Sequence, residues 1–171
     1  MSFISEANNG KVFAPGYFLL NNEDVTRVTR QISDSGVEAE DGVKVVKGGT
    51  AYPSNDANAI GIVYEDIDVT TGPMPGSVVT QGTIIEDRLA ITGESYDAVT
   101  PVTGDNPAEK GWYERSGSAG SYVYTLTDDT TVTEGTTYYA KSDVRLASAA
   151  KTALIALGFK FVTDTEVTRP Y

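Results

Sequence analysis

Cysteine and histidine are both absent from the 171 residues of this chain. Without cysteine the chain can form neither a disulfide nor a thiolate nucleophile. Without histidine it cannot build a Ser-His-Asp triad, a Cys-His pair or a zinc site with imidazole ligands. These absences remove the commonest catalytic and metal-binding arrangements, so we expect a protein that is not an enzyme and that uses no metal or cofactor.

Basic residues are scarce as well: 13 Lys and Arg stand against 24 Asp and Glu, which gives a formal net charge of −11 at pH 7. The cations are spread along the chain and form no basic patch. Because phosphate backbones and anionic lipids bind clustered cations, we expect neither nucleic acid nor membrane among the partners. The same charge predicts mutual repulsion between free copies.

Long hydrophobic runs are also missing. No stretch approaches the roughly 20 apolar residues of a membrane span. The first residues, "MSFISEANNGK", have neither the basic nor the apolar region of a secretory signal. We therefore expect synthesis in a cytoplasm, without a cleaved signal.

What the chain does contain is a pattern of short strands. Between Tyr17 and Ile91, apolar segments such as "YFLLN", "GVKVVKGGTAY" and "GSVVTQGTII" are separated by glycine, proline and asparagine turns. "AIGIVY" is continuously apolar, which is typical of a central strand covered on both faces. The pattern predicts a mainly β protein with a small β-barrel or sandwich core.

A single helix is expected near the C-terminal end, in "DVRLASAAKTALIALGF". Asp143 is the predicted N-cap, and Gly158 is the predicted left-handed residue after the last turn. The helical spacing is carried by Val144, Ala147, Lys151, Leu154 and Ile155. A last short strand, "FKFV", and a C-terminal tail over residues 163–171 follow.

Residues 97–142 differ in composition and are predicted to be an inserted aromatic β module. They contain the only tryptophan, Trp112, and five of the ten tyrosines. The segments "GWYER", "SYVYTL" and "TTYYAK" predict a three-stranded β-meander with an aromatic core. The alternative is that some of these rings are exposed and bind a host-surface glycan, for which the candidates are Trp112, Tyr113, Tyr138 and Tyr139.

Three acids, Glu65, Asp66 and Asp68, follow the predicted central strand. In a continuous strand Asp66 and Asp68 would share a face, which is the arrangement that a carboxylate pair for hydrolysis or metal binding would need. The segment "EDIDVTTGPMPG" lacks the ligand spacing of an EF-hand. We expect these acids to lie at a solvated strand end or turn, with catalysis and metal binding as the alternatives.

The first residues, 1–14, predict an N-terminal arm that is either frayed or adds a strand to a neighbouring chain. Its isolated apolar residues are the candidate contacts: Phe3, Ile4, Val12 and Phe13. The predicted boundaries are thus an arm over 1–14, a β-core with helix over 15–96 and 143–162, the insertion over 97–142 and a tail over 163–171.

The segments "NAIGIVYEDIDVTTGPMPGSVVTQGTIIEDRL" and "TALIALGFKFV" resemble the head decoration proteins of tailed bacteriophages, the lambda-type capsid stabilisers and related head fibre proteins. The resemblance covers roughly residues 42–89 and 151–162. The insertion, with "NPAEKGWYERSG" and "YVYTLTDDTTVTEGTTYY", is similar to a small module of structural proteins from phages that infect Gram-positive bacteria.

This resemblance implies a structural virion protein on the outer capsid surface, whose partners are the major capsid protein and two further copies in a homotrimer. It also implies that the protein stabilises the mature head against the pressure of packaged DNA and that its N-terminal arm pairs with a capsid strand. The alternative is a head-fibre or receptor-type module that binds host glycans through the aromatic insertion.

Overall fold

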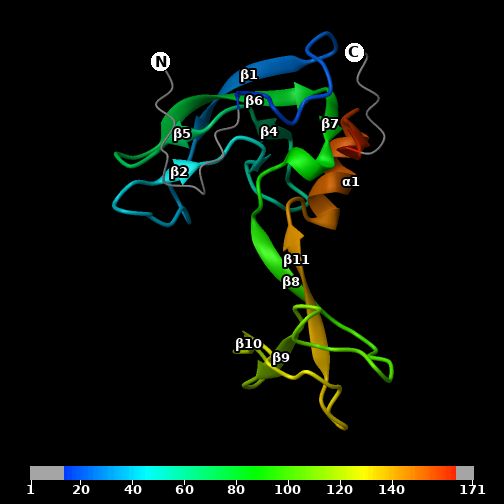
Figure 1. The fold of residues 1–171 in the computed structure, drawn as a ribbon. Helices are drawn as coiled ribbons and strands as arrows, with labels where there is room; N and C mark the ends of the chain where they lie inside the picture. The colour runs from blue at the N-terminus through cyan, green and yellow to red at the C-terminus, as the bar shows by residue number, and fades with distance from the viewer. Residues whose placement is uncertain (1–13, 165–171) are drawn as a thin grey trace. The chain divides into compact units, whose positions relative to one another are not determined.

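A computed structural model describes residues 14–164 and divides them into two compact units (Figure 1). The first unit contains the described residues up to Thr92 and those from Arg145 onward. The second unit is Gly93–Val144. This second unit includes the whole of the predicted 97–142 module and extends beyond it at both ends.

The first unit is built on a four-stranded antiparallel sheet. Its strand order is β1 (Thr26–Ile32), β6 (Met74–Gln81), β4 (Gly61–Val63) and β3 (Ala51–Tyr52). Two smaller pairs accompany it: β2 (Val45–Val46) with β5 (Ile67–Asp68), and β7 (Thr83–Ile85) in parallel with β12 (Lys160–Val162). A 3-10 turn, η1, follows β7 at Glu86–Arg88.

Both faces of the central sheet are buried, which explains the continuously apolar sequence of its middle strand. Ile62 and its cross-strand partner Val79 belong to one hydrophobic cluster, whereas the adjacent pair Val63 and Val78 belongs to a second. Neighbouring residues of a strand point to opposite faces, so the two clusters lie on opposite sides of the sheet. The prediction that "AIGIVY" contains a central strand is confirmed, because β4 lies between β6 and β3 and is buried throughout.

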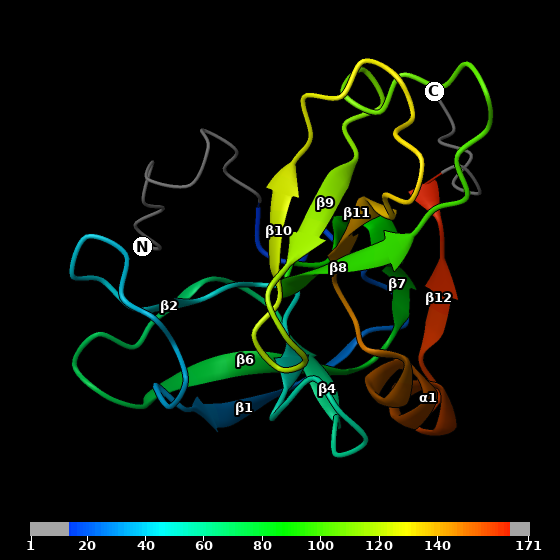
Figure 2. The same cartoon turned by 90° about the horizontal axis from the view of Figure 1, so that it is seen from below.

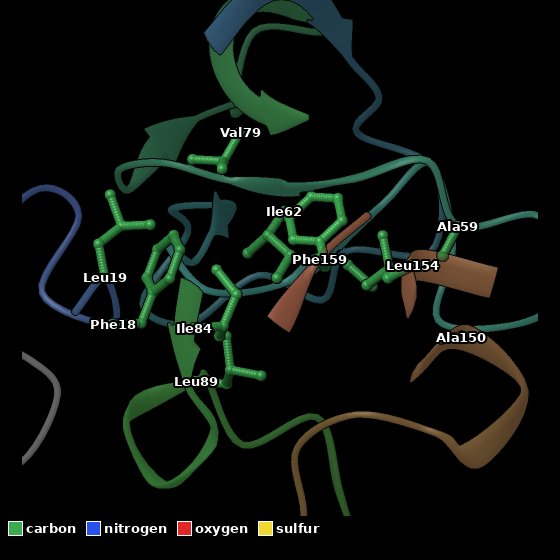
Figure 3. Close-up of a cluster of buried hydrophobic side chains, with 11 residues drawn as sticks. Phe18, Leu19, Ala59, Ile62, Val79, Ile84, Leu89, Ala150, Leu154 and Phe159 are labelled. Atoms are coloured by element: carbon green, nitrogen blue, oxygen red, sulfur yellow. The ribbon is translucent and has the colours of Figure 1, made fainter. Parts of the chain in front are cut away.

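The larger cluster joins this sheet to the helix and to the pair β7–β12. It is formed by Phe18, Leu19, Ala51, Ala59, Ile62, Val79, Ile84, Leu89, Ala150, Leu154 and Phe159, most of which are labelled in Figure 3. Each fully buried valine, leucine, isoleucine or phenylalanine side chain in this cluster contributes about 1.5–3 kcal/mol to folding. The described sheets do not close into a barrel, so of the two predicted architectures the sandwich-like one is found.

The helix α1 is Ser148–Ala156, and it begins later than predicted. Asp143 does not cap it, because Asp143 and Val144 lie in β11 (Tyr138–Val144), opposite Glu94 and Gly93 of β8 (Gly93–Ala98). Among the described residues no helix is both long enough and apolar enough to cross a membrane.

The end of α1 is where the sequence predicts it. Gly158 has a φ of +101°, the left-handed conformation in which glycine is favoured. Its N–H donates to the Ile155 carbonyl at 3.0 Å, and the Phe159 N–H donates to the Leu154 carbonyl at 3.1 Å. This pair of bonds is a Schellman motif, and it turns Phe159 back into the same cluster as Leu154.

The second unit is a four-stranded antiparallel sheet in the order β10, β9, β11, β8 (Figure 2). Its remaining strands are β8 (Gly93–Ala98), β9 (Tyr113–Ser116) and β10 (Val123–Leu126). The three predicted strands all form, but their order differs from a simple meander because β11 pairs with β9 and not with β10. The predicted boundary between residues 96 and 97 divides the fourth strand, β8, between core and insertion. Its pairing with β11 over Gly93–Ala98 places the whole strand in the second unit.

The first unit fastens the two chain segments that lead to and from Gly93–Val144. The Asn55 side-chain N–H donates to the Thr92 hydroxyl at 3.0 Å, and the Asn55 side-chain Oδ1 accepts the Ala147 N–H at 2.8 Å. The Thr92 hydroxyl donates to the Arg145 carbonyl at 3.1 Å, and the Arg145 guanidinium donates to the Leu89 carbonyl at 3.0 Å. One asparagine thus satisfies an orphan N–H at the start of α1 and ties together two segments that are distant in sequence.

Candidate functional site

Of the three acids after β4, Glu65 and Asp66 lie in the connection to β5, and Asp68 is the last residue of β5 (Ile67–Asp68). The strand ends at Val63 and the next one, β5, begins at Ile67, so Asp66 and Asp68 do not belong to one continuous strand. Asp66 and Asp68 therefore do not lie side by side on one face of a strand, which is the arrangement that a carboxylate pair would require.

Each aspartate has a local structural partner. Asp66 accepts the Gly48 N–H at 2.8 Å and faces the Lys47 ammonium at 3.4 Å, which holds the preceding turn against the end of β4. Asp68 accepts the Thr70 N–H at 2.9 Å. Hydrogen bonds from Thr70 hold the pKa of Asp68 below its usual value; the bond from the hydroxyl has the larger effect and the bond from the N–H the smaller. Within residues 14–164, no group of three or more acidic residues is arranged to hold a metal ion. The expectation of a strand end or turn is confirmed.

A hollow of about 480 Å³ lies beside the β6–β7 connection of the first unit. Glu23 and Asp24 line it together with Lys160, and all three residues are exposed. An open, polar depression with exposed charges of both signs is a solvated part of the surface. It differs from the enclosed, mostly apolar pockets that bind small molecules.

The proposed capsid contacts Phe3, Ile4, Val12 and Phe13 lie outside the described residues. The chain that follows them is firmly attached. The Gly16 N–H donates to the Tyr64 carbonyl at 2.9 Å, the Ile85 N–H to the Phe18 carbonyl at 2.7 Å, and the Leu20 N–H to the Thr83 carbonyl at 3.0 Å. Phe18 and Leu19 are buried in the larger cluster. The segment Gly16–Leu20 is therefore an anchor, defined by these contacts, between residues 1–14 and the core.

Arg88 of η1 contacts this anchor and also a residue near the C-terminal end of the described chain. Its guanidinium lies 4.7 Å from the centre of the Tyr17 ring and 2.6 Å from an Asp164 carboxylate oxygen. The hydrogen bond with Asp164 raises the pKa of Arg88 further. One half-buried cation thus joins the segments that lead to both chain ends.

The four aromatic residues that were candidates for glycan contact do not form an exposed site. Tyr138 is fully buried and Tyr139 is 6% exposed, so neither can reach a ligand in the folded unit; this part of the alternative is wrong. Trp112 and Tyr113 are half-buried. The Trp112 ring packs against Tyr138, with their centres 5.8 Å apart. The prediction of an aromatic core is confirmed.

Tyr138 is buried together with its hydrogen-bond partners. Its hydroxyl donates to the Asp129 carboxylate and accepts the Thr133 N–H at 3.1 Å. The Thr133 hydroxyl donates to the same carboxylate at 3.0 Å. Because every polar group here is paired, the arrangement is a satisfied buried network and not a reactive one.

Sequence reasoning missed a second aromatic group on the opposite face of this sheet. Tyr96 of β8 stacks on Tyr124 of β10 at 3.9 Å between ring centres, and Tyr113 and Tyr139 meet them edge-on at 5.3 and 5.2 Å. The Tyr96 hydroxyl donates to Glu94, which also pairs with Lys141. Both contacts hold the pKa of Glu94 below its usual value, and the contact with Lys141 has the larger effect. The alternation of tyrosines in "YVYTL", together with the tyrosine in "ESYDA", is the signal that could have revealed this cluster.

Replacing Trp112 with alanine is expected to destabilise Gly93–Val144 by about 2 kcal/mol. This is less than the cost of replacing a fully buried tryptophan, because the Trp112 ring is half-buried. Calorimetry is the suitable measurement, since the substitution removes the only indole fluorophore. Val102→Ala is the matched control, because Val102 is 64% exposed. A Trp112→Ala protein with unchanged unfolding that fails to bind host cells would contradict the core assignment.

Comparison of the chain with protein-family models, with curated proteins and with solved structures finds no match in any of the three.

Proposed function

We propose that this chain is a structural protein of a tailed-phage virion that binds the outer surface of the mature capsid as a trimer. In this role it bridges neighbouring capsid subunits and resists their separation under the pressure of packaged DNA. The resemblance of residues 42–89 and 151–162 to head decoration proteins supports the proposal. Those residues form most of the central sheet and the helix of the first unit.

The observation that carries the proposal is the anchor Gly16–Leu20. A protein that resists separation of its partners must transmit load from its binding segment to its core. Three backbone hydrogen bonds and two buried side chains hold this anchor in the first unit. Load applied to residues 1–14 would therefore reach the central cluster before the chain could peel away.

A single arm would bind weakly, since each added backbone hydrogen bond is worth only about 1 kcal/mol net. Three arms on one trimer act together, and linkage of this kind raises avidity by roughly 10²-fold or more without a new type of contact. The trimer is therefore part of the proposed mechanism and not only a packing arrangement.

Deleting residues 1–14 is expected to weaken binding to expanded, undecorated heads of the same phage by at least about 10²-fold, because the linked arms are lost together. Co-sedimentation of purified protein with such heads measures this. The matched control lacks residues 165–171 instead, and circular dichroism checks that both truncated chains are folded.

Saturable binding that only the N-terminal deletion weakens would support the proposal. If the full-length chain does not pellet with heads, capsid decoration is refuted. If both truncated chains bind as the full-length chain does, decoration stands and the arm is not its anchor.

A further inference from the structure

The outer edge of β10 carries no charge, although the protein as a whole is acidic. No Asp, Glu, Lys or Arg occurs in residues 116–127, although the chain as a whole has a net charge of −11. β10 is at the end of its sheet, with β9 on one side and no strand on the other among the described residues (Figure 2). Natural proteins usually protect such an edge with lysine, proline or a bulge, and β10 has none of these.

Large apolar side chains are exposed along this same edge. Tyr122 is 42%, Val123 58% and Leu126 56% exposed. Tyr122 is held in place by Arg115, whose guanidinium lies 4.2 Å from the centre of its ring. The edge therefore offers both unpaired backbone groups and an ordered apolar surface.

The hydrogen-bond pattern determines which backbone groups of β10 point outward. The Thr127 N–H donates to the Trp112 carbonyl at 3.0 Å, so the backbone of Thr127 faces β9 as in a hydrogen-bonded pair. Such pairs alternate along an antiparallel ladder, which makes Thr125–Glu114 hydrogen-bonded and Leu126–Tyr113 and Tyr124–Arg115 non-hydrogen-bonded. The N–H and C=O groups of Tyr124 and Leu126 consequently point away from β9, and by the same alternation so do those of Tyr122.

We propose that β10 pairs antiparallel with β10 of a second copy of this chain. A symmetric pair centred on Tyr124 places Tyr122 opposite Leu126 of the second copy, and all three residues present outward backbone groups. The two most exposed side chains on that face then cover each other, as favourable cross-strand neighbours do.

The lack of charge on β10 permits a second copy of this acidic chain as the occupant, and it separates β10 from the longer edge strands. The other edge of the same sheet, β8, carries Glu94 and Asp97, and the edge strand β1 carries Arg27 and Arg30. Either of these strands would bring like charges together when paired with itself. β3, the other edge of the first unit's sheet, is also uncharged but has only two residues, Ala51–Tyr52. β10 lets two strongly acidic copies meet without opposing charges.

The contact is small, and we expect it to be weak in free solution. If the chain also decorates a capsid as proposed above, copies held side by side would strengthen this contact through their high local concentration. The pairing itself does not depend on that role.

Sedimentation velocity of the full-length chain over a wide concentration range tests the pairing. The wild-type chain is expected to self-associate, and Leu126→Lys is expected to raise the dissociation constant at least about tenfold, because two lysines then lie within the small contact. Val102→Lys is the matched control: it adds the same charge at a residue of the same unit that is 64% exposed and not on β10, and it should associate as wild type does.

Hydrogen exchange on the wild-type chain gives a second test that needs no variant. The amides of Tyr124 and Leu126 should be protected at high concentration and should lose that protection on dilution. A chain that stays monomeric at every concentration, or self-association that Leu126→Lys leaves unchanged, would overturn the proposal. So would amides of Tyr124 and Leu126 that exchange freely while the chain is associated.

Discussion

Leu154→Ala is expected to lower the free energy of unfolding of the first unit by about 3 kcal/mol, within the roughly 2–5 kcal/mol range of buried leucine truncations. Leu154 is fully buried and lies in the cluster that joins α1 to the central sheet. It also accepts the Phe159 N–H that ends the helix. That hydrogen bond is accepted by the backbone carbonyl and survives the substitution, so the expected loss is that of the buried side chain alone.

The size of this effect follows from the shortness of α1, which has 9 residues. Isolated helices of this length are unstable in water, so tertiary packing must supply the stability. Only Ala150 and Leu154 of α1 are buried, and alanine offers little surface to lose. Docking of α1 therefore depends mainly on Leu154.

The neighbouring residue provides the control. Ile155 is 53% exposed, and Ile155→Ala should change the free energy of unfolding by no more than about 0.5–1 kcal/mol. Urea unfolding followed by circular dichroism, with hydrogen exchange of the β4 amides to report on the first unit, measures both variants. Equal losses for the two substitutions would show that α1 is not docked through Leu154.

Gly61→Ala is expected to destabilise the first unit by about 3 kcal/mol, at the upper end of the usual cost of overpacking. A Cβ at this position would lie 2.5 Å from the Val79 carbonyl oxygen and 2.5 Å from a Val78 methyl carbon. The carbonyl belongs to the backbone of β6, so β4 and β6 would have to move apart in the middle of the sheet. A rotamer change of Val78 could relieve only one of the two contacts.

Gly93→Ala is the matched control, because its added Cβ would meet no atom within 4 Å and its φ is not positive. That substitution should be neutral or slightly stabilising, since alanine has less conformational freedom to lose on folding. Thermal unfolding of the two variants measures the difference. A Gly61→Ala protein as stable as Gly93→Ala would mean that β4 and β6 are not packed as closely as these distances indicate.

The residues around α1 show what local sequence can predict. The helix end depended on neighbours within a few positions: a glycine in the left-handed conformation and two nearby carbonyls. It was predicted correctly. The start depended on whether Asp143 and Val144 would pair with a strand some 50 positions earlier. Their local preference for a helix was overridden by that pairing.

The aromatic insertion shows the same division. Its composition predicted a β module whose rings would form its interior, because a unit this small has few other apolar side chains to bury. The contribution of β8 was missed, since nothing in "GESYDA" indicates which of two units it joins. Tyr96 and Tyr124 lie on the two edge strands of the sheet, and only the folded sheet brings their rings together.

The sequence by itself determined the β class, the central position of "AIGIVY", the end of the helix and the exclusion of histidine- and cysteine-based chemistry, because these depend on composition and on contacts between near neighbours. Tertiary structure decided that Asp66 and Asp68 belong to separate turn contacts, that Tyr138 and Tyr139 are interior, that Asn55 fastens Thr92 and the start of α1, and that β10 is an open edge. Apart from the local Asp68–Thr70 contact, each of these depends on which distant segments pair. The free energy of that pairing comes from burying apolar and aromatic side chains within each unit and not from local preference.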